Sequence, residues 1–523
     1  MVMKKSLTLL LAAVILVSAL AGCGTDSKSA ADSEVASQTA EAAAQPAAET
    51  VVTVAIPADF GSMDPRQATN TNNTALCTNM YSTLLKTDKD YNIVLDTAES
   101  YEFVDEHTYK FTLKKGILFH DGVEMKTEDV QYTFDSIRQP DKTYRLGGDF
   151  NYMYIEPIDD YSFYLKMDTP NSSSLLRLGN MKIIPKHYIE SIGEEAFALA
   201  PIGSGPYKFV SWKKDEQVVL EAFDEYFEGA PEIDKVIFKI IPESSARVAA
   251  LEAGEVDLIT AVSTNQVARL EGTGDISVVA DGTTRVVYFT LNTLEEGPLQ
   301  DLRVRQAINA AIDRDIIVNG VIDGYGNAIH TFALPFFPNF NSDLEGYSYD
   351  LEKAKELMAE AGYQDGFEIE IGGSFSSLSN GSDVAQIVAQ QLAEIGIKST
   401  VIEKDSNTVK EEYLAGISSE LTLTSFGGIT NDVCYMNKIV LGSGQRYSAW
   451  ADPVFDELVE KAVSSIEPKE QESNIKAVQT YAFDNACVVP LYQNKAIFAY
   501  NSRLQNWQPR VDEQILLYGA SVK

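Results

Sequence analysis

Two hydrophobic patterns alternate along the chain after residue 49. Short runs rich in β-branched residues predict strands, whereas longer stretches with apolar residues every three or four positions predict amphipathic helices. The predicted strands cover 51–56, 108–113, 162–167, 236–241, 286–291 and 368–371. Because strands and helices alternate, the pattern predicts an α/β fold.

Several predicted helices begin at an aspartate, whose side chain can accept hydrogen bonds from the first free backbone N–H groups. These aspartates are Asp301, Asp350, Asp383 and Asp452. Gly362 is expected to end the second helix, and a further helix is expected over 471–483. The helix after Asp383 lies between predicted strands 368–371 and 399–402, so this unit predicts a parallel sheet covered by helices.

The first residues have the pattern of an export signal. Two lysines precede an uncharged apolar run over 7–21, and at about 15 residues this run is shorter than the ~20 that a membrane-spanning helix needs. The sequence LAGC at 20–23 resembles a bacterial lipobox. It predicts a lipoprotein signal peptide over 1–22 and lipidation of Cys23, which would anchor the protein to the outer face of the cell membrane. An ordinary signal peptide followed by a chance cysteine is the alternative.

The segment 23–49 is predicted to be a disordered tether. It contains no aromatic residue and a single aliphatic β-branched residue, Val35, which is too little apolar volume for a core. Such a tether would let the folded part stand off the lipid surface.

Length and charge narrow the class of protein. At roughly 150 residues per domain, a chain of 523 residues predicts about three domains. The 76 acidic residues against 42 basic ones give a formal charge of −34. This charge repels polyanions, so no nucleic-acid partner is expected.

Cysteines and histidines offer no metal or redox site. Cys77, Cys434 and Cys487 show no C-x-x-C spacing, and because three cysteines cannot all pair, buried free thiols are expected. The four histidines show no H-x-x-x-H spacing, so we expect no protein-built metal site and no cofactor.

No motif of a catalytic site is present. The sequence lacks a G-x-S-x-G elbow, an H-E-x-x-H pair, a P-loop and a G-x-G-x-x-G turn after a strand. Ser204 precedes Pro206 and a strand-like run, which is typical of a turn. His120 and Asp121 are interpreted as part of a polar turn rather than as an acid–base pair. The protein is therefore not expected to be an enzyme.

Several segments together resemble one family. The most distinctive is YKFTLKKGILFHDGVEMKTEDVQYTF at 109–134. Other segments occur in the order in which the family has them. One precedes this segment, at 63–65, and four come after it, at 203–212, 225–258, 299–317 and 349–362. The chain thus resembles the family 5 extracellular solute-binding proteins over nearly all of 50–510. That family serves ABC importers of dipeptides, oligopeptides and nickel complexes.

The resemblance implies a two-lobed periplasmic-binding-protein fold of type II (Venus-flytrap), with an additional domain inserted in lobe I. The implied limits are 50–85, 200–290 and 488–523 for lobe I, 86–199 for the extra domain, and 291–487 for lobe II. A solute would be enclosed between the lobes and delivered to a permease and its ATPase, with no bond made or broken. Such a receptor works naturally as a monomer.

The resemblance leaves the solute open. Peptide receptors of the family hold the peptide amino group with an acid in a W-x-x-D-like segment, which corresponds to 425–433 here and places Ile429 at the acidic position. Dipeptide receptors also use an arginine for the ligand carboxylate, whereas 375–383 contains none. Both charged anchors of the dipeptide pattern are therefore absent. Other candidate anchors are Asp432, Arg145, Arg285 and Arg446.

A peptide is the expected solute. Neutral polar segments at 68–74 and 374–382 suggest a nickel or other metal chelate, or an oligosaccharide, as alternatives, although both segments can also be solvated loops. A secreted hydrolase or a surface chaperone is the alternative from another class. The candidate ligand-binding residues are Asn70, Thr71, Asn72, Asn73, Ser377, Asn380, Phe426, Gly428, Ile429, Thr430 and Asp432.

Overall fold

The computed structural model describes residues 49–523 except 69–70, 90–91, 140–143 and 428–431. The chain divides into Met1–Ala48 and Glu49–Lys523, and the description below concerns the second unit. Its α-helices are α1 (Thr71–Met80), α2 (Thr127–Ile137), α3 (Gly147–Phe150), α4 (Ser174–Arg177), α5 (Lys186–Ile192), α6 (Glu194–Phe197), α7 (Ser244–Glu252), α8 (Thr264–Glu271), α9 (Leu302–Ala311), α10 (Arg314–Ile316), α11 (Leu351–Glu360), α12 (Gly381–Ala393), α13 (Ser406–Ala415), α14 (Val433–Leu441), α15 (Pro453–Ser464) and α16 (Pro468–Asp484).

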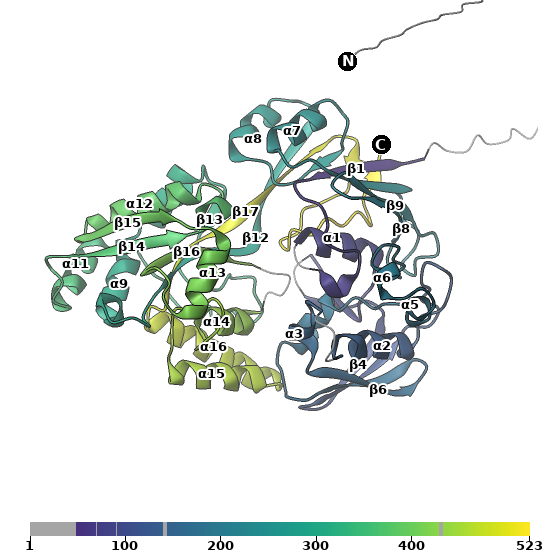
Figure 1. The fold of residues 1–523 in the computed structure, drawn as a ribbon, viewed down its shortest axis with the longest axis horizontal. Coiled ribbons are helices and arrows are strands. Elements are labelled where there is room, and N and C mark those ends of the chain that lie inside the picture. Colours follow the sequence, from purple (N-terminus) through teal and green to yellow (C-terminus); the bar gives the residue numbers. More distant parts are fainter. Residues whose placement is uncertain (1–48, 69–70, 90–91, 140–143, 428–431) are drawn as a thin grey trace, which may run out of the picture. The chain divides into compact units, whose positions relative to one another are not determined.

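Among the described residues, eleven strands form one sheet in the order β15-β14-β16-β12-β17-β11-β1-β10-β9-β8, with β13 paired to β17 (Figure 1). These strands are β1 (Val51–Ile56), β8 (Tyr207–Lys213), β9 (Gln217–Ala222), β10 (Lys235–Ile240), β11 (Leu258–Ile259), β12 (Ile276–Leu291), β13 (Gly326–Ala328), β14 (Phe367–Gly373), β15 (Ile397–Glu403), β16 (Leu421–Phe426) and β17 (Val488–Asn501). A second sheet has the order β4-β5-β7-β6 and is built from β4 (Ala98–Asp105), β5 (Thr108–Leu113), β6 (Met153–Asp159) and β7 (Ser162–Met167).

Two lobes share the long antiparallel strands β12 and β17. The first lobe contains β1, β8 to β11 and the four-stranded sheet, whereas the second contains β14 to β16 (Figure 1). β17 pairs with β11 of the first lobe, and β12 pairs with β16 of the second. The pairing between β12 and β17 is interrupted between Gly282 and Val286.

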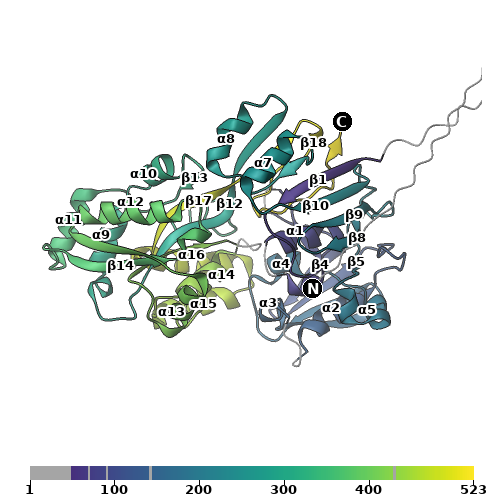
Figure 2. The same ribbon diagram turned by 45° about the horizontal axis from the view of Figure 1, so that its top comes forward.

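Alternate residues of β12 enter two different cores, because successive side chains of a strand point to opposite faces. Val287 and Phe289 pack with α9, α11 and α12, whereas Val286 and Tyr288 pack with α14, α15 and α16. The helices of the second lobe therefore cover both faces of its sheet (Figure 2). The four-stranded sheet has a separate core with α2.

Most of the local predictions agree with the structure, although the strand predicted over 286–291 is the end of the longer β12, Ile276–Leu291. β1, β5 and β7 have the predicted bounds, and β14 and β15 are parallel as expected. Asp301, Asp350 and Asp452 accept hydrogen bonds from backbone N–H groups at the starts of α9, α11 and α15. Two helix starts were wrong: α12 begins at Gly381 rather than Asp383, after Asn380 in the left-handed region, and α16 begins at Pro468 rather than at 471.

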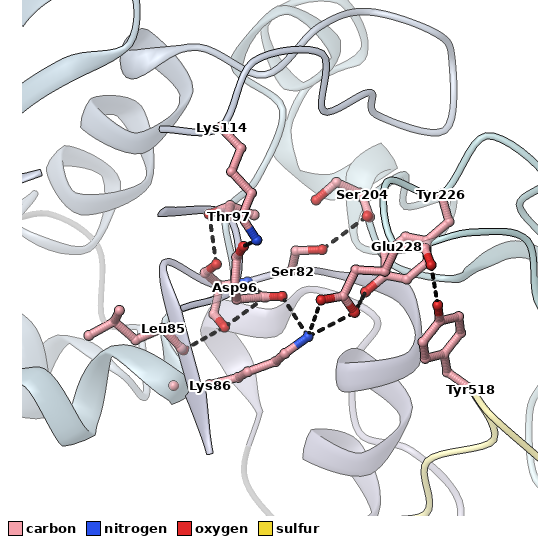
Figure 3. A network of polar contacts seen from close by, with 12 residues as sticks. Ser82, Leu85, Lys86, Asp96, Thr97, Lys114, Ser204, Tyr226, Glu228 and Tyr518 are labelled. Carbon is pink, nitrogen blue, oxygen red and sulfur yellow. Dashed lines mark hydrogen bonds and ion pairs between the residues drawn. The ribbon is translucent and has the colours of Figure 1, made fainter. Parts of the chain in front are cut away.

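A polar network ties the entry of the four-stranded sheet to the rest of the first lobe (Figure 3). Oδ2 of Asp96 accepts hydrogen bonds from the backbone N–H of Thr83 at 2.8 Å and from its hydroxyl at 3.1 Å. The Lys86 ammonium lies 3.1 Å from Oδ1 of Asp96 and 2.8 Å from Oε1 of Glu228. The Tyr518 hydroxyl donates to the Glu228 carbonyl at 2.6 Å. Four distant segments therefore meet at this network.

Cys77, Cys434 and Cys487 are free and buried, which confirms the expected thiol state. In the described part of the chain, no helix has the length and apolar character needed to cross a membrane.

Candidate functional site

A cleft of about 370 Å³ lies where β12 and β17 pass between the lobes, and we call it the interlobe cleft. Its walls come from the first lobe, the second lobe, the shared strands and the C-terminal segment. The lining residues are Pro57, Asn72, 260–264, Arg285, Ile322, Tyr325, Leu378, Ser379, Tyr492, 494–498, Glu513 and Ile515.

Arg285 and Glu513 place opposite charges in the interlobe cleft. Nε of Arg285 lies 3.7 Å from Oε1 of Glu513, and Nη1 of Arg285 donates to the Ser425 hydroxyl at 3.4 Å. The two charged side chains keep 33% and 27% of their surface exposed, so this pair is partly hydrated. A partly hydrated pair is weak, and each member can exchange its partner for a charged group of a ligand.

The cleft wall at 260–264 is held by Arg247, which is 2% exposed. Its guanidinium donates to the carbonyls of Thr260 at 3.0 Å, Ala261 at 2.7 Å, Ile241 at 2.7 Å and Pro242 at 2.6 Å. Ala261 has φ 50°, a conformation that a residue with a side chain adopts only when its surroundings impose it. Burial lowers the pKa of Arg247. The guanidinium of Arg247 therefore holds the strained backbone at Ala261 in the cleft wall.

Replacing Arg247 with lysine is expected to lower the free energy of unfolding by roughly 3 kcal/mol, because the three N–H groups of an ammonium cannot satisfy four carbonyls that are buried or partly buried. Urea unfolding followed by circular dichroism would measure the change. Arg269→Lys is the matched control, since that side chain is 56% exposed and pairs with Glu252 at the surface. Equal urea midpoints for the two variants would contradict the role given to Arg247.

The segment 68–74 reaches the interlobe cleft through Asn72. Thr71 begins α1, and Asn72 lines the cleft while its amide donates to the Ala58 carbonyl at 3.3 Å. Asn73 is buried, accepts from the Gly61 N–H at 3.0 Å and donates to the Ser62 carbonyl at 2.7 Å. Asn73 therefore supports the preceding loop, and it does not line the cleft.

The segment 374–382 also reaches the cleft, but through residues other than the two proposed. Ser377 ends a 3-10 helix, Phe375–Ser377, and the cleft is lined by Leu378 and Ser379. Asn380 donates to the Val321 carbonyl at 2.6 Å and stands at the start of α12. Its side chain connects two segments of the second lobe.

Four of the proposed residues, together with neighbouring sequence, fall outside the described part of the chain. They are Asn70, Gly428, Ile429 and Thr430, and Cys23 also lies outside it. Phe426 ends β16, with its ring 6.3 Å from that of Tyr435. Asp432 does not line the interlobe cleft. Its Oδ1 caps α14 by accepting hydrogen bonds from the N–H groups of Cys434 and Tyr435 at 3.0 and 3.1 Å.

Of the three arginines proposed as anchors, Arg285 lines the interlobe cleft and the other two do not. Arg145 lies 3.5 Å from a carboxylate oxygen of Asp149, and Arg446 lies over the Tyr447 ring at 4.9 Å. The sequence interpretation missed Glu513 and the wall at 260–264. The wall follows the two-residue strand β11, which pairs in parallel with β1, and ligands bind at the carboxyl ends of parallel strands. The sequence pattern did not predict so short a strand, so this signal becomes visible only in the fold.

The FHDG turn has a structural role. The Gly203 N–H donates to Nδ1 of His120 at 3.1 Å, so Nε2 carries the proton and donates to the Gly205 carbonyl at 3.0 Å. Burial lowers the pKa of His120 to about 4. Ser204 is fully buried. Within the described ranges, no group of three or more His, Cys, Asp or Glu side chains is placed to hold a metal ion.

Comparisons with known proteins agree with this architecture. The profile of the bacterial extracellular solute-binding proteins, family 5, matches residues 92–448. The oligopeptide-binding protein AppA of Bacillus subtilis is 34% identical over 348 residues, which cover 62% of this chain and 64% of that protein. Heme-binding protein A of Haemophilus influenzae is 26% identical over 99% of this chain and 100% of its own length.

A solved structure extends the likeness to three dimensions. The ABC transporter substrate-binding protein CtaP of Listeria monocytogenes superposes with a TM-score of 0.83 at 25% identity, over 91% of this chain and 99% of that one. The two lobes, the shared strands and the family profile lead to one conclusion: this chain belongs to family 5 of the bacterial extracellular solute-binding proteins.

Proposed function

We propose that this protein is the solute receptor of an ABC importer and that it holds its solute in the interlobe cleft. The observation that carries the proposal is that residues of both lobes and of the shared strands line one cleft. A solute that contacts both lobes stabilises the closed arrangement, which a permease can then distinguish from the open one. The likeness to AppA and CtaP supports this function. Such a receptor changes no bond in its solute and is not an enzyme.

A short peptide is the proposed solute. Arg285 and Glu513 offer a cation for the peptide carboxylate and an anion for its ammonium, in a cleft whose other walls include neutral polar residues such as Asn72 and Asn494. These two groups would replace the anchors that the sequence lacks at Ile429 and in 375–383. A metal chelate or an oligosaccharide would use the neutral walls instead, and the heme-binding relative shows that one scaffold serves different solutes.

A thermal-shift screen tests the solute class, because a ligand that binds only the folded state raises its melting temperature. Di- to octapeptides, nickel chelates, oligosaccharides and hemin would be compared. A shift with peptides supports the proposal. A shift with another class and none with peptides would refute the peptide and keep the receptor, whereas turnover of a peptide or glycoside would refute the receptor function.

Charge removal at the two anchors gives a sharper prediction. Arg285→Gln and Glu513→Gln are each expected to weaken peptide binding by roughly 30-fold or more, since a buried ligand charge loses its partner. Calorimetric titration would measure both. N-acetylated peptides should be less sensitive to Glu513→Gln, because they carry no ammonium. Arg446→Gln is the control outside the cleft. A large loss of peptide affinity in this variant, with none in Arg285→Gln, would show that Arg285 does not bind the peptide carboxylate.

The remaining sequence predictions belong to the same proposal. Residues 1–22 would be removed on export, Cys23 would carry lipid, and the tether would hold a monomeric receptor at the outer face of the membrane. Glu49 belongs to the folded part, since its carboxylate pairs with Lys235 at 2.5 Å. The domain limits stay as proposed: 50–85, 200–290 and 488–523 for lobe I, 86–199 for the extra domain and 291–487 for lobe II.

A further inference from the structure

A second cavity, of about 460 Å³, lies between the four-stranded sheet and the second lobe, and we call it the lateral pocket. None of its lining residues lines the interlobe cleft. Tyr101 and Phe103 of β4 form part of one wall and remain 38% and 57% exposed. Ile466 and Ile475 form part of the opposite wall. Its surface is therefore mainly aromatic and aliphatic.

Direct contacts hold the two walls together. Ile466, in the connection between α15 and α16, is 9% exposed and packs into the core of the four-stranded sheet. The Ser172 N–H donates to the Val463 carbonyl at 2.7 Å, and the Gln471 amide donates to the Ser172 carbonyl at 3.0 Å. The pocket is thus built jointly by the two lobes, away from the interlobe cleft.

The charged groups of the lateral pocket all have the same sign. Among the described residues, Asp432 and Glu467 line it and no lysine, arginine or histidine does. Oε2 of Glu467 accepts from the Glu470 N–H at 2.9 Å, so this carboxylate caps α16. Asp432 is 7% exposed, and its Oδ2 is buried with no hydrogen-bond partner in the described structure. A buried carboxylate oxygen without a partner is unfavourable, and a cation would satisfy it.

We propose that the lateral pocket binds a small organic cation with an apolar body, an alkyl- or arylammonium. The ammonium would pair with the Asp432 carboxylate, and the body would lie between Phe103 and Ile466. Charge-assisted hydrogen bonding and contact with aromatic rings are the interactions that such a molecule needs. The site is separate from the proposed solute site and does not depend on which solute the interlobe cleft takes.

Phenethylammonium is the probe, titrated into the full-length protein by calorimetry. Saturable binding is expected, at least 10-fold tighter than that of 3-phenylpropionate, which has the ring and the opposite charge, or of methylammonium, which has the charge alone. Absence of phenethylammonium binding, or equal affinity for phenylpropionate, would overturn the proposal.

Two variants locate the site. Asp432→Asn removes the charge while asparagine still caps α14, and Phe103→Ala removes a ring that is 57% exposed and packs at its edge on Tyr109. Each is expected to weaken phenethylammonium binding at least 10-fold. Val104→Ala is the matched control, because Val104 is 50% exposed on the same strand and does not line the pocket. Unchanged binding by Phe103→Ala, or a loss in Glu513→Gln alone, would place the probe elsewhere and refute the site.

Discussion

Replacing Asp96 with asparagine is expected to lower the free energy of unfolding by roughly 3 kcal/mol, the lower end of the cost of removing one charge from a buried ion pair, because its partner Lys86 is partly exposed. Asp96 is 4% exposed, and it pairs with Lys86 while holding the Thr83 N–H (Figure 3). Asp96 lines a cavity of about 110 Å³ together with Lys86 and Lys182, and Lys182 is also buried. Asparagine would take the attraction of this carboxylate away from the buried Lys182 ammonium, whereas Lys86, which is 37% exposed, would keep Glu228 at 2.8 Å.

Urea unfolding at pH 7 would measure the loss at Asp96. Asp160→Asn is the control, because Asp160 is 66% exposed and pairs with Lys126 at the surface, where ion pairs contribute little. If both variants unfolded at the same urea concentration as the parent, the network would have no stabilising role.

Replacing Lys182 with methionine is expected to have the opposite effect and to raise the free energy of unfolding at pH 7 by roughly 3 kcal/mol. Lys182 is 5% exposed, and its ammonium donates to the Gly179 carbonyl at 3.2 Å. Burial lowers its pKa from 10.5 to about 8, despite the attraction of Asp96. The folded state therefore disfavours the charged form that the unfolded state keeps.

The sign of the pH dependence follows from that pKa. Below pH 8 both states carry the proton, so the parent bears the full cost of burying the charge. Between pH 8 and 10.5 the folded state releases its proton first, and the parent becomes more stable as the pH rises. Cys77, which faces Lys182, has its pKa raised to about 12 by burial and stays neutral in this window. The advantage of Lys182→Met should accordingly fade above pH 8.

Urea unfolding of parent and variant at pH 7, 9 and 10.5 would check this prediction. A constant advantage at all three values would show that packing, rather than charge, is responsible. In the double variant, the loss from Asp96→Asn should be smaller than in the parent background, because the buried Lys182 cation is gone.

The sequence by itself determined several local elements of this protein. β1, β5 and β7 could be placed residue by residue because strand patterns lie within a few consecutive positions. The caps at Asp301 and Asp452 could be placed for the same reason, since a capping side chain bonds to a backbone group two or three residues away. The order of the sequence motifs also predicted the family, and the profile match at 92–448 confirms that prediction.

The tertiary structure alone decided which residues share a site. Asn72 and Arg285 were candidates from sequence, but Glu513 and the wall at 260–264 reach the same cleft from segments that lie hundreds of residues apart. Asp432 was a candidate anchor by alignment, whereas in the structure one of its oxygens caps α14 and the residue lines the lateral pocket. Local patterns specify what a side chain can do. Long-range strand pairing, through β12 and β17, decides what it meets.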